Sequence, residues 1–79
     1  MTLKELLQLT SGNEDVRVDV FNMYTENKKV FEGKRNRLVE LIRYEKKYMK
    51  YADKQVRVIS ATTDNAGDPI LFILLEHCR

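Results

Sequence analysis

The sequence predicts an α+β fold with the element order α-β-β-α-β-β, in which a four-stranded, mainly antiparallel sheet carries one long amphipathic helix on one face. Two segments, near residues 16–20 and 55–62, alternate apolar and polar residues as half-buried strands do. Turn residues and a second strand-like segment follow each of them, which predicts two hairpins. Between the hairpins, apolar residues recur at helical spacing. The 79 residues form one domain, 1–79.

The chain is predicted to open with a short helix. Thr2 and Glu5 have the spacing of a capping box, leucines follow at helical intervals, and residues 11–13 end the helix. The first strand is predicted to begin at residue 16 and to run on to Tyr24. A turn at 25–27 then leads to a returning strand over 28–32, which Gly33 ends.

Asn36 is the predicted N-cap of a long helix over residues 37–52. At 100° per residue, one face of this helix is apolar. It carries Leu38, Leu41, Ile42, Met49 and Ala52. Glu45 is the one misfit, because it points towards this apolar face; we expect it to lie at an edge or to pair with a cation.

The second hairpin is predicted from a strand over 55–62, a turn over 64–69 and a strand over 70–75. Gly67 suits a positive φ in that turn. The last strand is apolar on both alternating faces, and such a strand needs cover on both sides. The short N-terminal helix or a second copy of the chain could supply this cover, and the second copy would make a homodimer.

Charge is unevenly distributed along the chain. Residues 28–54 hold ten basic and four acidic residues, whereas the rest holds four basic and eight acidic ones. The basic pole could meet nucleic-acid phosphates or an acidic protein groove, or it could be a solvated face. The tyrosines beside it could stack bases, anchor a protein interface or seal the border of the core. The candidate binding residues are Arg43, Tyr44, Lys46, Lys47, Tyr48, Lys50, Tyr51 and Lys54.

No arrangement of residues predicts catalysis, so we expect a protein that is not an enzyme and has no cofactor. The glycines are isolated, and no nucleophile-elbow pattern occurs. His77 and Cys78 are adjacent, so on a strand they would point to opposite faces. Zinc held by these two residues and by carboxylates is the one metal site that the sequence offers, without a spaced Cys or His pair to support it.

We expect a cytoplasmic protein without a membrane segment. The longest apolar run, residues 70–75, is far shorter than the roughly 20 residues that span a bilayer. The first residues include Glu5 and lack the apolar region of a signal peptide. A single cysteine excludes an internal disulfide and is compatible with a reducing compartment.

The opening MTLKELL, the strand VRVDVFNMY, the following KKVFEG and the later KQVRVISATTDNAGDPILFILLE resemble short uncharacterised proteins of phages and mobile elements of Gram-positive bacteria. Some phage proteins of this size inhibit host defence, and these include anti-CRISPR proteins. The resemblance implies a non-enzymatic interaction protein that binds and inhibits a larger host protein, such as a CRISPR effector or another nuclease. The alternative is direct nucleic-acid binding through the basic helix 37–54.

Overall fold

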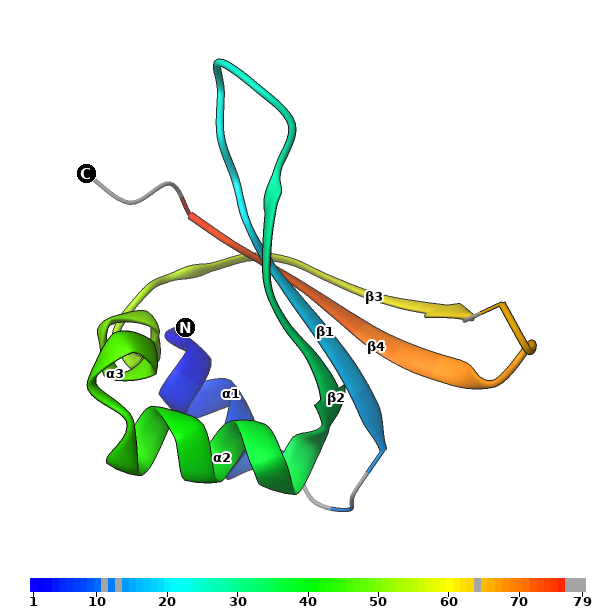
Figure 1. The fold of residues 1–79 in the computed structure, drawn as a ribbon, viewed down its shortest axis with the longest axis horizontal. Coiled ribbons are helices and arrows are strands. Elements are labelled where there is room, and N and C mark those ends of the chain that lie inside the picture. Colours follow the sequence, from blue (N-terminus) through cyan, green and yellow to red (C-terminus); the bar gives the residue numbers. More distant parts are fainter. Residues whose placement is uncertain (11, 13, 64, 77–79) are drawn as a thin grey trace.

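A computed structural model describes residues 1–10, 12, 14–63 and 65–76 (Figure 1). Its fold is α+β with a four-stranded sheet, as predicted, but the order is α-β-β-α-α-β-β. The elements are α1 (Leu3–Leu9), β1 (Asp15–Val20), β2 (Lys28–Lys34), α2 (Arg35–Tyr44), α3 (Lys46–Ala52), β3 (Val56–Thr63) and β4 (Pro69–Leu75).

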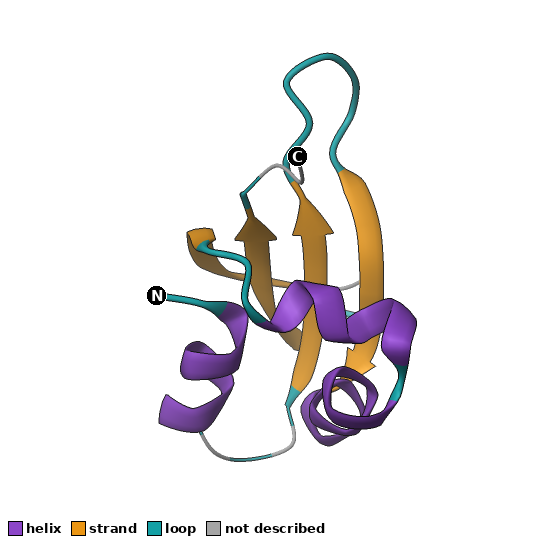
Figure 2. Cartoon of the chain, turned by 90° about the vertical axis from the view of Figure 1, so that its left-hand side faces the viewer, coloured by secondary structure: helices purple, strands orange, loops and turns teal. Residues whose placement is uncertain are grey.

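The sheet is mixed, with the strand order β2-β1-β4-β3. Each hairpin pairs antiparallel, whereas β1 and β4 lie parallel at the centre. The strands with the most buried apolar residues thereby take the two inner positions, where neighbours flank them on both sides. The three helices lie on one side of the sheet (Figure 2).

The core lies between that side of the sheet and the helices. Val16 and Val18 of β1 and Ile73 and Leu75 of β4 are fully buried there, and α1 contributes Leu3 to the same cluster. The N-terminal helix therefore covers the same face as α2, so of the two possible covers for the other face, this helix and a second copy, the helix is not the one. On that other face, which we call the outer face, β4 remains partly exposed.

The prediction of one long helix is wrong, because the chain breaks at Glu45. This residue has extended backbone, with φ −101° and ψ 116°, and it separates α2 from α3. A continuous helix would turn the Glu45 carboxylate towards the apolar face, where burial of a charge is costly. The break leaves Glu45 exposed, and its carbonyl accepts the backbone N–H of Tyr48 at 2.9 Å and of Met49 at 3.0 Å.

Helix α2 begins at Arg35, earlier than predicted, because tertiary contacts hold that residue. The Arg35 N–H donates to the carbonyl of Glu14 at 3.0 Å. Arg35 is only 9% exposed, and its guanidinium donates to the carbonyls of Leu7 and Thr10. A buried cation thus connects the C-terminal end of α1 to the start of α2, where it also complements the negative end of the α1 dipole.

Two strand boundaries differ from the prediction. Strand β1 ends at Val20, because the side chains of Asn22 and Asn27 accept backbone N–H groups in the following loop. Strand β2 continues through Gly33, whose missing side chain makes room for a ring. A Cβ built on Gly33 would lie 3.2 Å from Cζ of Phe31.

Two local predictions are confirmed. In the capping box, the Thr2 N–H donates to Oε1 of Glu5 and the Glu5 N–H donates to Oγ1 of Thr2, both at 3.1 Å. Gly67 has a φ of +87° in the turn of the second hairpin. Within the described ranges, no helix has the length and apolar character that crossing a membrane requires.

Candidate functional site

The break at Glu45 divides the predicted binding residues into two groups. Lys47, Tyr48, Lys50 and Tyr51 belong to α3 and lie against β2. Arg43 and Tyr44 belong to α2, and Arg43 lines a different hollow, between the helices. The single basic stripe that a straight helix would present is therefore not formed.

Beside β2, α3 forms a small groove of about 260 Å³, which we call the lysine–tyrosine groove. Its lining residues are Lys28, Lys29, Val30, Lys47, Tyr48, Lys50 and Tyr51. Four of the seven are lysines and two are tyrosines, so ammonium groups and aromatic rings share one concave surface. No acidic residue is among the described residues that line it.

The cations of this groove lie close to its rings. The Lys47 Nζ is 5.3 Å from the centroid of the Tyr48 ring, and the Lys50 Nζ is 5.2 Å from the centroid of the Tyr51 ring. Both distances are within the range of a cation–π contact. A contact of this kind at an exposed site is worth about 0.5–1 kcal/mol, so a stronger ligand can displace it.

Little negative charge offsets the groove. In the described part of the chain, the one ion pair of a groove lysine joins Lys29 Nζ to Oε1 of Glu32 at 3.7 Å, with both side chains about half exposed. Exposed pairs of this length contribute about 0–1 kcal/mol. The groove therefore keeps a positive potential that favours an anionic ligand.

The other predicted binding residues lie outside this groove. Tyr44 is exposed at the end of α2, and Lys46 is exposed at the start of α3. Lys54 follows α3, and its carbonyl accepts the backbone N–H of Leu3 at 3.0 Å. Conversely, Lys28 and Lys29 line the groove although they are not among the predicted binding residues. They belong to the basic segment 28–54, but only the packing of α3 beside β2 brings them to the α3 lysines.

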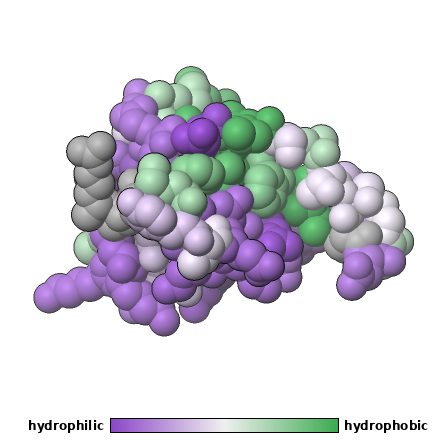
Figure 3. Space-filling view, turned by 90° about the horizontal axis from the view of Figure 1, so that it is seen from above, coloured by the Kyte–Doolittle hydropathy of each residue, from purple (hydrophilic) through white to green (hydrophobic). Residues whose placement is uncertain are grey.

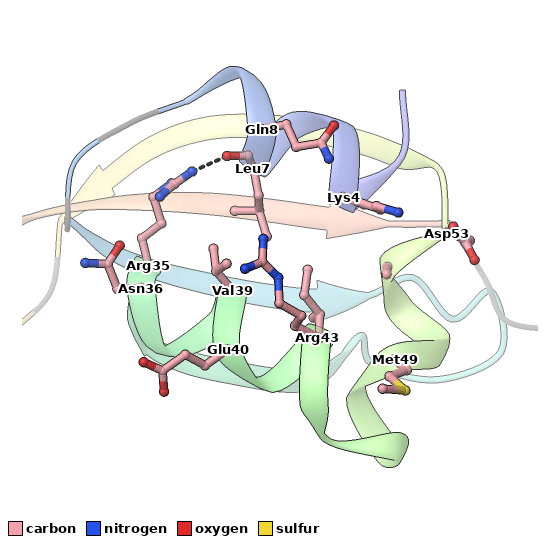
Figure 4. Close-up of a pocket in the computed structure, with 12 residues that line it drawn as sticks. Lys4, Leu7, Gln8, Arg35, Asn36, Val39, Glu40, Arg43, Met49 and Asp53 are labelled. Atoms are coloured by element: carbon pink, nitrogen blue, oxygen red, sulfur yellow. Dashed lines mark hydrogen bonds between the residues drawn. The ribbon is translucent and has the colours of Figure 1, made fainter.

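A second hollow, of about 800 Å³, lies between the three helices (Figure 4). Leu7, Val39 and Met49 form part of its apolar lining, and the Arg43 side chain extends from α2 towards Leu7. Its charged groups are of both signs, with Lys4, Arg35 and Arg43 against Glu40 and Asp53. This mixture favours no single ligand charge.

The outer face of the sheet holds a third hollow, of about 850 Å³. Its carboxylates are paired with cations: Nε of Arg17 is 3.1 Å from Oδ1 of Asp19, and Nζ of Lys34 is 3.0 Å from Oδ1 of Asp15. The hydrogen bond to Asp19 raises the pKa of Arg17. Ion pairs of this kind do not provide the separated acid and base that proton transfer requires.

The described residues contain no cluster of three His, Cys, Asp or Glu side chains that could hold a metal ion. The zinc ligands considered from the sequence, His77 and Cys78, lie outside the described residues. No protein-family model, curated protein or solved structure matches this chain.

Proposed function

We propose that this chain is a non-catalytic binding protein whose lysine–tyrosine groove binds single-stranded nucleic acid. One observation carries the proposal. Lysines from β2 and from α3, which are separate in the sequence, meet around two tyrosine rings. Basic side chains that neutralise phosphates, beside aromatic rings that stack bases, are the combination used by proteins that bind single strands without sequence preference.

The geometry supports a single strand rather than a duplex. A groove of about 260 Å³ has room for one unpaired base, with the neighbouring phosphates at its rim beside the lysines. Stacking needs an unpaired base, which a duplex does not offer. When a base stacks on Tyr48 or Tyr51, the lysine beside that ring is released to contact a phosphate, so both ligand groups are engaged together.

The test is the salt dependence of binding to a fluorescein-labelled oligothymidylate of about 12 nucleotides, a length within the usual site size. Four lysine contacts predict a slope of log K against log salt of about −2 to −3. Lys47→Gln and Lys50→Gln should each reduce the slope by about 0.7. Tyr48→Leu should cost about 1–3 kcal/mol if a base stacks there.

Lys46→Gln is the matched control, because Lys46 is an exposed lysine of the same helix that does not line the groove. It removes the same charge and should change the affinity much less than Lys47→Gln. Equal losses from the two variants would place binding outside the groove. Absence of binding in low salt at about 100 µM protein, a concentration that detects nonspecific affinities, would refute the proposal.

A second candidate function is binding of a cytoplasmic host protein through the outer face, as the resemblance to mobile-element proteins implies. What favours it is the hollow of that face, where Ile70 and Phe72 are half buried beside ion-paired charges. Apolar groups ringed by polar ones are typical of protein interfaces. A nuclease-treated pull-down tests it. Recovery of a CRISPR effector or another nuclease, lost with Phe72→Glu and retained with Lys47→Gln, would support inhibition of a host protein.

A further inference from the structure

Strand β3 is an open edge of the sheet. It is the last strand in the order β2-β1-β4-β3 (Figure 1), and each of its residues after Val56 is exposed. Only its start is covered, because the Val56 N–H donates to the carbonyl of Met1 at 2.7 Å and Thr2 bridges to Gln55. The segment 57–63 therefore presents backbone N–H and C=O groups that can pair with another strand.

The two edges of this sheet differ in how they are protected. Edge strand β2 carries four charged residues and leads directly into α2. Charges of this kind prevent edge-to-edge pairing. Strand β3 has one charged residue, Arg57, which pairs with Glu76 at 3.3 Å, and it has neither proline nor lysine. Its central residues have the β-branched and small side chains typical of paired strands.

Exposed apolar side chains occur on both faces of β3. Val58 is 43% exposed and lies in register with Leu74, whereas Ile59 is 47% exposed and lies in register with Ile73. They point to opposite faces of the sheet, so a partner lying on either face would cover only one of them. A strand added at the edge contacts both. In Figure 3, hydrophobic residues continue across the molecule towards the hairpin of β3 and β4.

We propose that two copies of this chain pair antiparallel through β3, which joins the two four-stranded sheets into one continuous sheet. This surface shares no residue with the lysine–tyrosine groove. Residues directly opposite in an antiparallel ladder point to the same face, so the two-fold axis must lie midway between a residue and its own copy, and that residue pairs with itself. Because Met1 covers Val56, the axis falls at the centre of segment 57–63, which is Ser60.

This register fits a second copy. Ser60 faces the partner's Ser60, Ile59 faces the partner's Ala61, and Val58 faces the partner's Thr62. Arg57 lies opposite the partner's Thr63, so no like charges meet. One strand pair buries less than the roughly 800 Å² per partner of a standard interface. The dimer is therefore weak, and its population rises with protein concentration.

Cross-linking tests the register in a Cys78→Ser background, in which the introduced cysteine is the only thiol. Ser60→Cys places two cysteine Cα atoms about 4.5–5.5 Å apart, within the range that a disulfide spans. Thr62→Cys is the matched control. It lies on the same strand and face, but its Cys pair is about 13 Å apart along the ladder. Under oxidised glutathione, Ser60→Cys should give covalent dimer many-fold faster than Thr62→Cys.

Sedimentation equilibrium of the unmodified chain tests the association itself. The mean mass should rise towards twice that of the monomer between about 10 µM and 1 mM, the range of a weak interface. Ile59→Lys should remain monomeric with an unchanged circular dichroism spectrum, whereas Glu32→Lys on β2 should still associate. A monomer at 1 mM, or equal cross-linking of Ser60→Cys and Thr62→Cys, would overturn the proposal.

Discussion

Replacing Arg35 tests how the helical layer is held together. In Arg35→Met, the side chain keeps its length and its apolar contacts but loses the guanidinium. The carbonyls of Leu7 and Thr10 then lose their charged donor, and Oγ1 of Thr10 loses the hydrogen bond that Nε of Arg35 donates to it at 3.1 Å. The C-terminal end of α1 is no longer connected to the start of α2.

The expected magnitude follows from these contacts. A hydrogen bond to a charged group contributes about 1.5–3 kcal/mol, and an unsatisfied buried acceptor costs about 1–3 kcal/mol. Water from the adjoining hollow can reach some of the carbonyls, so the expected loss is about 2–4 kcal/mol rather than the full sum. A domain of this length has a total stability of about 4–12 kcal/mol. The melting temperature should therefore fall by about 10–25 °C.

Urea unfolding at pH 7, followed by far-ultraviolet circular dichroism, measures this loss as a shift of the midpoint at a constant slope. Arg37→Met is the matched control on the same helix. Arg37 is exposed and pairs with Glu40 at 3.3 Å, so the loss in Arg37→Met should be about 0.5 kcal/mol or less. If Arg35→Met lost no more than this control, the buried guanidinium would not connect α1 to α2.

Three further predictions concern other contacts. Arg17→Leu leaves the carboxylate of Asp19, a residue that is 5% exposed, without its partner, so the free energy of unfolding in urea should fall by about 1–3 kcal/mol. Replacing both residues by leucine should lower the free energy of unfolding less, because no buried carboxylate is then left unpaired. An equal or larger loss in the double variant would contradict this. Hydrogen bonds with the backbone N–H of Thr2, and then with its hydroxyl, lower the pKa of Glu5. The ionised Glu5 carboxylate therefore stabilises the fold at pH values above its ordinary pKa, and this stabilisation is lost as the pH falls through the lowered pKa. Glu5→Gln should flatten the decline of stability between about pH 5 and pH 3, and an unchanged decline would argue against the capping box as its cause. Gly67→Ala should lower the free energy of unfolding by about 1–2 kcal/mol. This loss comes from the positive φ alone, because no atom lies within 4 Å of a Cβ built on Gly67. An unchanged melting temperature would show that the turn adapts.

Local features of the sequence predicted local features of the structure. The capping box of Thr2 and Glu5, the alternation around Val16 and Val18, and the positive φ of Gly67 each depend on a few neighbouring residues. Neighbouring residues also signalled the break between α2 and α3, because Glu45 did not fit the apolar face. An edge position or pairing with a cation explains such a misfit without a break, and a continuous helix satisfies more backbone hydrogen bonds when no tertiary contact is considered.

The candidate site was predictable only in part. The lysines and tyrosines of α3 stand close together in the sequence, so their charge and aromatic content were visible. Their separation from Arg43 and Tyr44 was not visible, because it depends on the direction that the chain takes after Glu45. Lys28 and Lys29 join the groove through packing of α3 beside β2, a contact between residues about twenty positions apart.

By itself, the sequence determined the α+β class, the two hairpins and the basic character of the segment 28–54, because composition and short-range periodicity are local properties. Tertiary structure alone decided the parallel pairing of β1 with β4, the side on which α1 packs, and the exposure of β3. These features depend on which apolar faces can be buried together in one core. A strand pattern shows that a face must be covered, but only the packed chain shows what covers it.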